Sequence, residues 1–462
     1  MDSWVNRERL CQRDKHGHFI REWGLPCHAE RQDGDLDLSE FTWWGWDHHW
    51  NKHLRAPDLD SSDNPRTLGL HWSRGAIRTS HFIGAVRLGE GEGASPLIIE
   101  SKIPGLDAAS VFAEVLAAPK SITGVEFDLL FGCDTEQEPI DAVDLPGLTL
   151  LEVIAYLHSL AHFVQRHLRQ GFVRVQENLI GKVRGRVLIS RHVRENLARA
   201  RPDRVICEFT VFSLDTLENR ILKAALDIAG HWLTQAALAP DLQDALHRWS
   251  AIARTALATV PDCRVNPRDW SAVHKTGLMA AYARPLALAR MILARLHLTP
   301  NGRVNDDPGR TFPFFLNANR LFEAWVGVCL HAAGCPVRAQ VARRLNVCEG
   351  GAVEFRPDFV LGPDPWAVVD AKYKILGADR LISADLFQAI GYTRLLTPHL
   401  ADQEHVHAFR EAWLAIPDSQ GEDPLSVEQA KQLFCARWIN RDGIRWPDEY
   451  RLGCVKVPLP RL

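Results

Sequence analysis

The stretch RPDFVLGPDPWAVVDAK, residues 356–372, contains two short apolar runs separated by a proline-rich turn. Apolar runs on either side of such a turn predict the two antiparallel strands of a hairpin. Asp358 stands where the first strand begins, and Asp370 stands where the second strand ends. Both carboxylates therefore lie at the same end of the predicted hairpin, where they can converge on one ligand.

Lys372 follows Asp370 by two residues, and side chains two apart lie on the same face of a strand. Ala371 faces the opposite side, while Val368 and Val369 predict a buried strand. Charged groups at the end of an apolar strand are costly unless they are paired or bound to a metal. A surface salt bridge between the lysine and the aspartate is the alternative that this pattern leaves open.

These residue types suit the hydrolysis of a phosphodiester, which needs an activated water and relief of the charge that develops on the phosphate. A divalent cation held by Asp358 and Asp370 can supply both. Mg²⁺ prefers a few carboxylate oxygens and keeps its remaining waters, so two acids suffice, with Mn²⁺ as a substitute. The carbonyl of Ala371 can add an oxygen ligand, and Lys372 can orient the attacking water and stabilise the charged phosphate.

Two residues on the next predicted helix, 384–396, extend this set. Gln388 and Tyr392 are four positions apart, so they lie on one face of that helix. The resemblance described below implies that both belong to the catalytic site together with the charged residues of the hairpin.

Two further acids are candidates. Glu323 lies beside the apolar stripe of a helix predicted over 317–333, where it is either a metal ligand or a solvated carboxylate. Glu354 lies upstream of Asp358 and on the same face of the predicted strand.

The rest of the chain predicts a multi-domain protein of the α/β (α+β) class. The β-branched runs 82–88 and 96–100 flank a glycine-rich turn and predict a hairpin. The pattern TLLE at 149–152 is typical of a capping box and predicts a helix that ends near residue 170. The polar stretch 299–310, TPNGRVNDDPGR, is the best linker candidate. We predict a β-rich N-terminal module (1–146), a mainly helical middle region (147–300) and a C-terminal nuclease domain (301–462). The resemblance described below implies that the N-terminal module docks on a partner.

Bulk properties narrow the classes of function. A chain of 462 residues is too long for one ordinary core and suggests two or three domains. The net charge of -3 excludes a global basic field, so any contact with nucleic acid comes from a local patch or a partner. No run approaches the roughly 18–20 uninterrupted apolar residues that span a bilayer, and the N-terminus lacks the apolar core of a signal peptide. We expect a cytoplasmic protein without a membrane partner, whose ten cysteines form no CxxC pair and stay reduced.

The first 80 residues are polar and rich in tryptophan, most densely at 43–50, WWGWDHHW. This segment is either an aromatic contact surface for a partner or for bases, or a loop packed on its own sheet. His49 and His53 are four positions apart, a spacing that suits a metal only on a helix with further ligands.

An arginine-rich segment follows the first middle helix. From Arg174 to Arg204 it contains nine Lys or Arg and three Asp or Glu. Lys182, Arg184 and Arg186 stand in its β-like part, and we predict that they contact DNA phosphates. The resemblance described below offers instead the nucleotide sites and loops of a motor ring. A solvated face with internal ion pairs is the alternative. Asn219, on an apolar helix face further along, is predicted to make structural contacts.

These motifs form a longer series. Its members are GKVRGR (181–186), CEF (207–209), LDTLENRILK (214–223), VDAKY (369–373) and DLFQ (385–388). The two aspartates, the lysine and the QxxxY element resemble the RecB-like branch of the PD-(D/E)xK nucleases, which implies a restriction-endonuclease-like last domain. The whole series, over about 150–462, resembles McrC, the nuclease subunit of McrBC-type (type IV) modification-dependent restriction systems.

That resemblance implies a DNA endonuclease subunit of an anti-phage complex, with metal-binding acids at Asp358 and Asp370 and a catalytic lysine at Lys372. It also implies an McrB-like AAA+ NTPase hexamer, using GTP or ATP, as the partner and modified double-stranded DNA as the substrate. The chain contains no P-loop pattern GxxxxGK[ST], so it is not the motor itself. Two alternatives stay open: a mainly non-catalytic activator of the AAA+ partner, and a stand-alone RecB-like DNA-repair nuclease.

Overall fold

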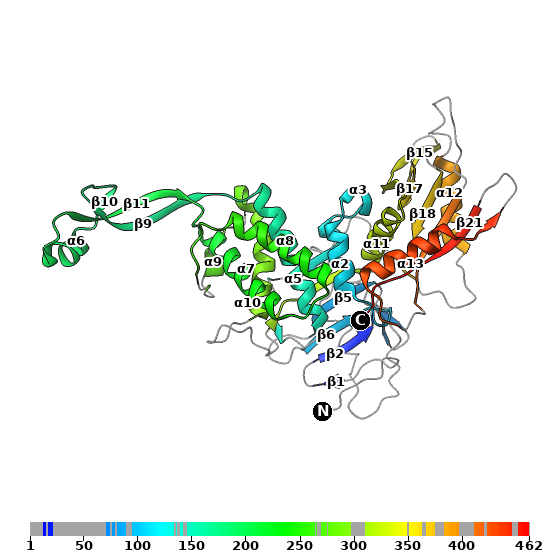
Figure 1. The fold of residues 1–462 in the computed structure, drawn as a ribbon, viewed down its shortest axis with the longest axis horizontal. Helices are drawn as coiled ribbons and strands as arrows, with labels where there is room; N and C mark the ends of the chain where they lie inside the picture. Colours follow the sequence, from blue (N-terminus) through cyan, green and yellow to red (C-terminus); the bar gives the residue numbers. More distant parts are fainter. Residues whose placement is uncertain are drawn as a thin grey trace. The chain divides into compact units, whose positions relative to one another are not determined.

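The protein is a mixed α/β chain with several sheets, as the sequence predicts (Figure 1). It forms two compact units, one made of residues 1–154 and 308–462 and the other of residues 155–307. The bounds of the second unit are similar to those of the predicted middle region, 147–300. The predicted first and last domains, in contrast, belong to one unit. The computed structural model describes residues 13–14, 17–21, 71–73, 76–78, 81–88, 95–133, 135, 139–141, 146–263, 265, 269–274, 276–296, 310–348, 351–362, 366–374, 383–396, 411–419, 423–445 and 451–461.

One sheet of the first unit contains strands from both ends of the chain, in the order β1-β2-β6-β5-β13-β7. β5 and β6 pair antiparallel, which confirms the predicted hairpin. β13 lies between β5 and β7 and pairs antiparallel with both, so a strand that follows the linker candidate completes the N-terminal sheet. The strands are β1 (Arg13–Asp14), β2 (Gly17–Arg21), β5 (Phe82–Leu88), β6 (Ser95–Glu100), β7 (Phe131–Cys133) and β13 (Phe314–Asn317).

A second six-stranded sheet has the order β14-β17-β18-β19-β21-β20. β17 and β18 pair antiparallel, as the predicted hairpin requires, while β18–β19 and β19–β21 pair parallel. The strands are β14 (Val337–Ala339), β17 (Phe359–Leu361), β18 (Ala367–Ala371), β19 (Glu411–Pro417), β20 (Ile444–Arg445) and β21 (Arg451–Val457). Shorter two-stranded pairs are β3 (His71–Ser73) with β4 (Ala76–Arg78), β8 (Ile140–Asp141) with β12 (Arg310–Thr311), and β15 (Arg343–Cys348) with β16 (Gly351–Phe355).

Helices cover both faces of this second sheet. Phe359 of β17 contacts Gly327 of helix α11 (Ala318–Ala332). Its neighbour Val360 packs with Tyr392 of helix α12 (Ser383–Leu396). Because adjacent strand residues point to opposite faces, these two helices lie on opposite sides of the sheet. The helices of this unit are α2 (Ala108–Ala117), α3 (Lys120–Thr123), α4 (Phe127–Leu130), α11 (Ala318–Ala332), α12 (Ser383–Leu396) and α13 (Val427–Ile439).

The unit 155–307 is mainly helical, as predicted. Helix α5 (Pro146–Arg166), whose residues are divided between the two units, begins before the predicted Thr149, with proline in the first turn, where its missing N–H costs nothing. The predicted capping box is therefore wrong: Glu152 is buried within the helix and accepts a hydrogen bond from Thr311 Oγ1 at 2.6 Å. The remaining helices are α7 (Leu217–Gln235), α8 (Pro240–Ala256), α9 (Asp269–Ala272), η5 (Gly277–Tyr282) and α10 (Ala283–Arg295).

A long two-stranded ribbon, the arm (residues 171–213), extends from these helices (Figure 1). β9 (Gly171–Ile180) and β11 (Arg204–Ser213) pair antiparallel along their full lengths. The tip holds β10 (Arg186–Val187), α6 (Ile189–Glu195) and η4 (Leu197–Arg199). The predicted β-like segment is thus only the tip of a much longer element.

Some expectations fall on residues outside the described ones, namely the tryptophan-rich segment 43–50, His49 and His53, and residues 299–309 of the linker candidate. By length and composition alone, Gly147–Arg166 and Gly277–Arg295 are apolar enough to cross a membrane. The most apolar windows of these helices are 78 % and 39 % buried inside the protein. Core helices pass the same test, so the absence of a membrane partner stays a prediction.

Candidate active site

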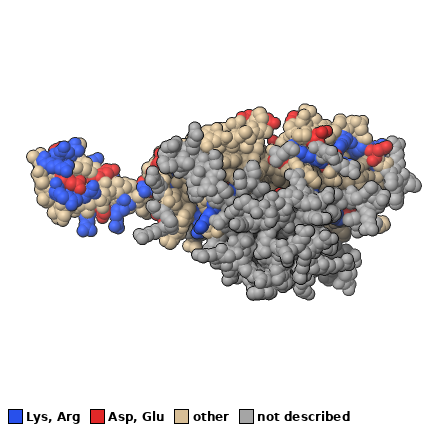
Figure 2. Space-filling view, turned by 90° about the horizontal axis from the view of Figure 1, so that it is seen from below, with Lys and Arg blue, Asp and Glu red and all other residues tan. Residues whose placement is uncertain are grey.

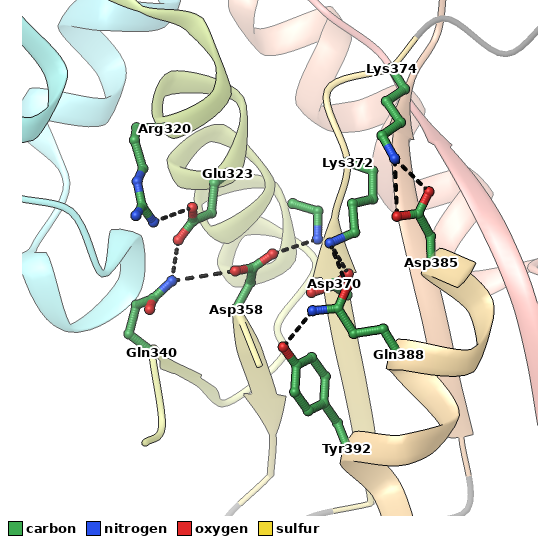
Figure 3. Close-up of polar contacts among 11 residues, drawn as sticks. Arg320, Glu323, Gln340, Asp358, Asp370, Lys372, Lys374, Asp385, Gln388 and Tyr392 are labelled. Atoms are coloured by element: carbon green, nitrogen blue, oxygen red, sulfur yellow. Dashed lines mark hydrogen bonds and ion pairs between the residues drawn. The ribbon is translucent and has the colours of Figure 1, made fainter. Parts of the chain in front are cut away.

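The β17–β18 hairpin brings Asp358 and Asp370 together. Phe359 pairs with Val369, so Asp358, one residue before β17, lies beside the end of β18 (Figure 3). Asp358 Oδ2 accepts a hydrogen bond from the Ala371 N–H at 2.7 Å. The side chain of Asp370 is almost inaccessible to solvent, with the residue 2 % exposed.

Lys372 lies on the same face as Asp370, as the spacing predicts. Its Nζ is 2.7 Å from Asp370 Oδ2 and 3.1 Å from Gln388 Oε1. The two residues do form the salt bridge that the alternative names, but not on an exposed strand end, because the aspartate is buried and the lysine side chain is only 21 % exposed.

Helix α12 adds Gln388 and Tyr392 to this group. Gln388 Nε2 donates to the Tyr392 hydroxyl at 2.7 Å, so both polar ends of the glutamine amide are occupied. A continuous chain of contacts then runs from Asp370 through Lys372 and the glutamine to the tyrosine (Figure 3). The helix thus adds a second polar contact to the end of the lysine side chain.

Glu323, on α11, approaches the site from the other side of Asp358. It is 7 % exposed, so the alternative of a solvated carboxylate is wrong. Arg320 Nη1 donates to its Oε2 at 3.0 Å, and Gln340 Nε2 donates to its Oε1. The same Gln340 nitrogen lies 3.4 Å from Asp358 Oδ1.

Glu354 does not join this group. It lies on β16, in a separate two-stranded sheet, where it is exposed and pairs with Arg356. The prediction assumed one continuous strand from Glu354 to Asp358, but the chain leaves β16 before β17 begins.

Burial dominates the electrostatics of the acids. It raises the pKa of Asp358 well above its ordinary value, and the nearby charges of Glu323 and Asp370 raise it further. Burial also raises the pKa of Asp370, although Lys372 opposes this shift, and it raises the pKa of Glu323 against the opposition of Arg320. Burial would lower the pKa of Lys372, but the charge of Asp370 and the other nearby acids outweigh it, so the pKa rises. The lysine therefore keeps its proton at neutral pH.

The donor chemistry of the two aspartates fits a hard divalent cation. One buried and one partly buried carboxylate, both with raised pKa values, favour a bound positive charge, and Mg²⁺ commonly takes one or two carboxylates and fills its shell with water. Within the described residues, no group of three or more His, Cys, Asp or Glu side chains lies close enough to hold a metal. The pair of aspartates is therefore the minimal protein ligand set, with Ala371 and Glu323 remaining predicted additions.

Sequence reasoning missed three polar residues of this site. Arg320 stands three positions before Glu323 on a helix, a spacing that predicts an ion pair. Lys374 forms an ion pair with Asp385 at 2.8 Å. It stands two positions after Lys372, so the alternation that relates Asp370 to Lys372 also predicts it. Gln340 has no local signal, because its contacts depend on how separate elements pack.

The predicted contact residues Lys182, Arg184 and Arg186 lie in the arm. All three are exposed, and the guanidinium of Arg184 lies 4.4 Å from the ring centre of Phe209. Figure 2 shows Lys and Arg side chains gathered at the free end of the arm. The alternative of internal ion pairs holds for part of the segment, since Arg191 and Arg194 both contact Glu195.

Comparison with solved structures finds remote likenesses. One is a refined half-complex from the tetradecameric assembly of Thermococcus gammatolerans McrB AAA+ hexamers with bound McrC, with 19 % identity and a TM-score of 0.39, covering 88 % of this chain and 85 % of that chain. Another is the cryo-EM structure of the Thermococcus gammatolerans McrBC complex, with 18 % identity and a TM-score of 0.29, covering 68 % of this chain and 87 % of that chain. No curated protein matches the chain.

The family described as McrBC 5-methylcytosine restriction system component matches residues 77–403, which is more than half of the chain. The matched range contains the β5–β6 hairpin, the arm and the β17–β18 hairpin with the following helix α12. The chain therefore belongs to the family of McrBC 5-methylcytosine restriction system components, which confirms the resemblance of its motifs.

Proposed function

We propose that this protein is the DNA endonuclease subunit of an McrBC-like anti-phage restriction complex in the cytoplasm. It would hydrolyse phosphodiesters of modified double-stranded DNA with Mg²⁺, for which Mn²⁺ can substitute. The observation that supports this proposal most is the convergence of Asp358, Asp370 and Lys372 at one end of a buried hairpin. A buried acid pair beside a lysine is costly for the fold, which favours a functional reason for its presence.

Each residue of the site has a distinct role in this proposal. Asp358 and Asp370 would hold the cation, which when bound supplies an activated water and relief of phosphate charge. Lys372, protonated at neutral pH, would hold the attacking water and the phosphate oxygen. Gln388 would orient the lysine ammonium, and Tyr392 would fix the glutamine amide in turn.

Replacing Asp370 tests the catalytic proposal. Asp370→Asn keeps the shape of the side chain but removes its charge, so Mg²⁺-dependent DNA cleavage should fall to background. Stimulation of the AAA+ partner's NTPase should persist, and the thermal unfolding midpoint should stay close to that of the wild type. The matched control is Asp442→Asn, an exposed aspartate after α13, which should cleave normally.

Loss of both cleavage and NTPase stimulation in Asp370→Asn would make the acid structural rather than catalytic. Wild-type protein that stimulates the partner's NTPase but never cuts DNA would favour the alternative of a non-catalytic activator. Cleavage by the wild type without any partner would favour the stand-alone repair nuclease instead.

For the partner contact we propose the tip of the arm, which would dock on an McrB-like AAA+ ring that hydrolyses GTP or ATP. The tip exposes Ile180, Val183 and Ile189, which are 61 %, 62 % and 70 % accessible, beside the basic Lys182 and Arg186. Adjacent exposed apolar side chains on a protruding element are typical of a surface that another protein covers. A surface that binds only DNA phosphates would need the charges but not these apolar groups.

Neutralising Arg184 and Arg186 together, as Arg→Gln changes, should weaken NTPase stimulation. The control is Arg166→Gln with Arg248→Gln, which removes two exposed charges from the helices of the same unit. If the arm instead binds DNA directly, DNA affinity measured without the partner should fall, with a smaller dependence on salt. If both NTPase stimulation and DNA affinity stay unchanged, Arg184 and Arg186 belong to an ordinary solvated surface without a binding role.

A further inference from the structure

Gln340 follows the edge strand β14, and its side chain lies between two acids of the site (Figure 3). Its Nε2 donates to Glu323 Oε1 and lies 3.4 Å from Asp358 Oδ1. These acids come from separate elements, helix α11 and the residue before β17. One uncharged amide therefore bridges two carboxylates that would otherwise repel each other.

The backbone holds Gln340 in this place in a costly conformation. Its φ of +53° lies in the left-handed region, which glutamine rarely adopts. The Gln340 N–H donates to the Asp358 carbonyl at 2.8 Å, which ties the residue to the hairpin. On its other side lies Gly124, where an added Cβ would be 2.8 Å from Gln340 Cγ. Contacts that maintain an unfavourable backbone conformation are concentrated at functional sites.

We propose that Gln340 is a positioning residue that sets the separation of Glu323 from Asp358 and so orients both carboxylates around the site of the divalent cation. The inference rests on the proposed function, because it requires Asp358 and Asp370 to hold that cation. Arg320 holds the second oxygen of Glu323, so the arginine and Gln340 fix this carboxylate from two directions. Groups that orient metal ligands in this way typically change metal affinity by about 10–100-fold when they are removed.

Two substitutions separate the amide from the backbone conformation. Gln340→Gly removes the amide but adopts the positive φ freely, so a purely structural role would be preserved. Gln340→Asn also tolerates this φ and keeps an amide, although one methylene shorter. The matched control is Gln432→Ala, which removes an exposed glutamine that hydrogen-bonds Glu428 on α13.

The measurement is Mn²⁺ binding to the full-length protein, followed through the electron paramagnetic resonance signal of free Mn²⁺. We expect Gln340→Gly to weaken binding by about tenfold or more, with Gln340→Asn intermediate and Gln432→Ala unchanged. Thermal unfolding without metal should place all three variants close to the wild type, since none loses a buried apolar group.

A double variant tests whether Gln340 acts through Glu323. Glu323→Gln with Gln340→Gly should bind Mn²⁺ as weakly as Glu323→Gln alone, because the two residues serve one contact. Independent, additive losses would overturn the inference, as would wild-type affinity in Gln340→Gly. If the wild type binds Mn²⁺ no better than Asp370→Asn, the proposed metal site itself fails and the inference fails with it.

Discussion

At the scale of single residues, the site places Glu323, Asp358 and Asp370 where solvent has little access. Burial, together with Glu323 and Asp370, raises the pKa of Asp358 well above 3.8. A raised carboxyl pKa means that the folded protein binds a proton more tightly than the unfolded chain. Between the ordinary and the raised pKa, stability therefore falls as pH rises. Without a cation, Asp358 thus destabilises the fold at neutral and alkaline pH.

We expect Asp358→Asn to stabilise the metal-free protein. The asparagine keeps an oxygen for the Ala371 N–H and removes a charge beside two other acids, a gain of about 1–2 kcal/mol. Urea unfolding in the presence of a chelator should show the gain at pH 8, and lowering the pH toward 4 should reduce it as the wild-type acid binds its proton. Asp442→Asn should show no such gain. A less stable Asp358→Asn protein at pH 8 would contradict this account.

The sequence predicts those site residues that are close to one another along the chain, and it fails for those that are brought together by pairing of separate elements. Asp358, Asp370 and Lys372 are related by strand alternation and a tight turn, and Gln388 and Tyr392 by helical spacing. Those relations are local, so the structure brings all five together as expected. Gln340 reaches the site only because β14 pairs with β17, a long-range pairing that no spacing in the sequence reveals.

At the scale of elements, the arm depends on the contacts at its root. Asn219 is fully buried on α7, and its Nδ2 donates to the carbonyls of Arg169 and Leu214 at 3.1 Å and 2.8 Å. Those residues flank the two strands of the arm, and the Tyr282 hydroxyl donates to Asn219 Oδ1 at 3.0 Å. The predicted structural role of Asn219 is therefore confirmed. One side chain of α7 therefore connects the root of both strands of the arm to the helices.

Asn219→Leu should destabilise the second unit by roughly 3 kcal/mol or more, because two buried carbonyls and a hydroxyl lose their partner. Tyr282→Phe removes the hydroxyl that donates to Asn219 and accepts from the Arg169 N–H at 2.9 Å, and should cost about 1–2 kcal/mol. Chemical unfolding measures both, and limited proteolysis should show faster cleavage near residues 169 and 214 in Asn219→Leu. The control Asn440→Leu changes an exposed asparagine directly after α13 and should leave the arm resistant to the protease. Equal resistance in Asn219→Leu would mean that strand pairing alone holds the root.

The strands of the arm escaped sequence analysis for a physical reason. Strand prediction relies on a buried face that alternates with an exposed one. Along β9, residues 171–180, partly buried and exposed side chains alternate only over the first six residues, and Leu179 is the one fully buried residue, so the buried face that predicts a strand is short and weak. Its stability comes from backbone pairing with β11, from a small buried cluster of Leu179, Cys207 and Phe209, and from the reciprocal amide hydrogen bonds of Asn178 and Asn196 at 2.9 Å.

At the scale of the whole molecule, the first unit joins distant parts of the chain. β13 pairs with β5 and β7, Lys431 pairs with Glu114 at 2.6 Å, and the Tyr373 hydroxyl lies 3.1 Å from Ser101 Oγ. Tyr373 directly follows the site lysine, and its carbonyl accepts a hydrogen bond from the buried Lys102. The candidate active site is therefore supported by residues that precede the arm as well as by those that follow it.

A fragment of residues 308–462 should accordingly fail to fold, although the linker candidate suggests a separable domain. Without residues 1–154, β13 loses both neighbours and α11 loses its contacts with α2 and α3. Circular dichroism and thermal unfolding of this fragment, compared with the full chain, provide the test. Deleting only the arm tip, residues 182–203, should leave a cooperative transition in the full chain. A fragment that melts cooperatively near the full-chain midpoint would restore the three-part division.

The position of β13 also orders events during protein synthesis. The ribosome releases β5 and β7 long before it has made residue 317. The edge of β5 that pairs with β13 is therefore unpaired while the helices and the arm are synthesised. An unpaired strand edge is a ready template for association with other nascent chains. Translation speed and chaperone capture across residues 134–313 should therefore govern the yield of native protein more than any change in the finished active site.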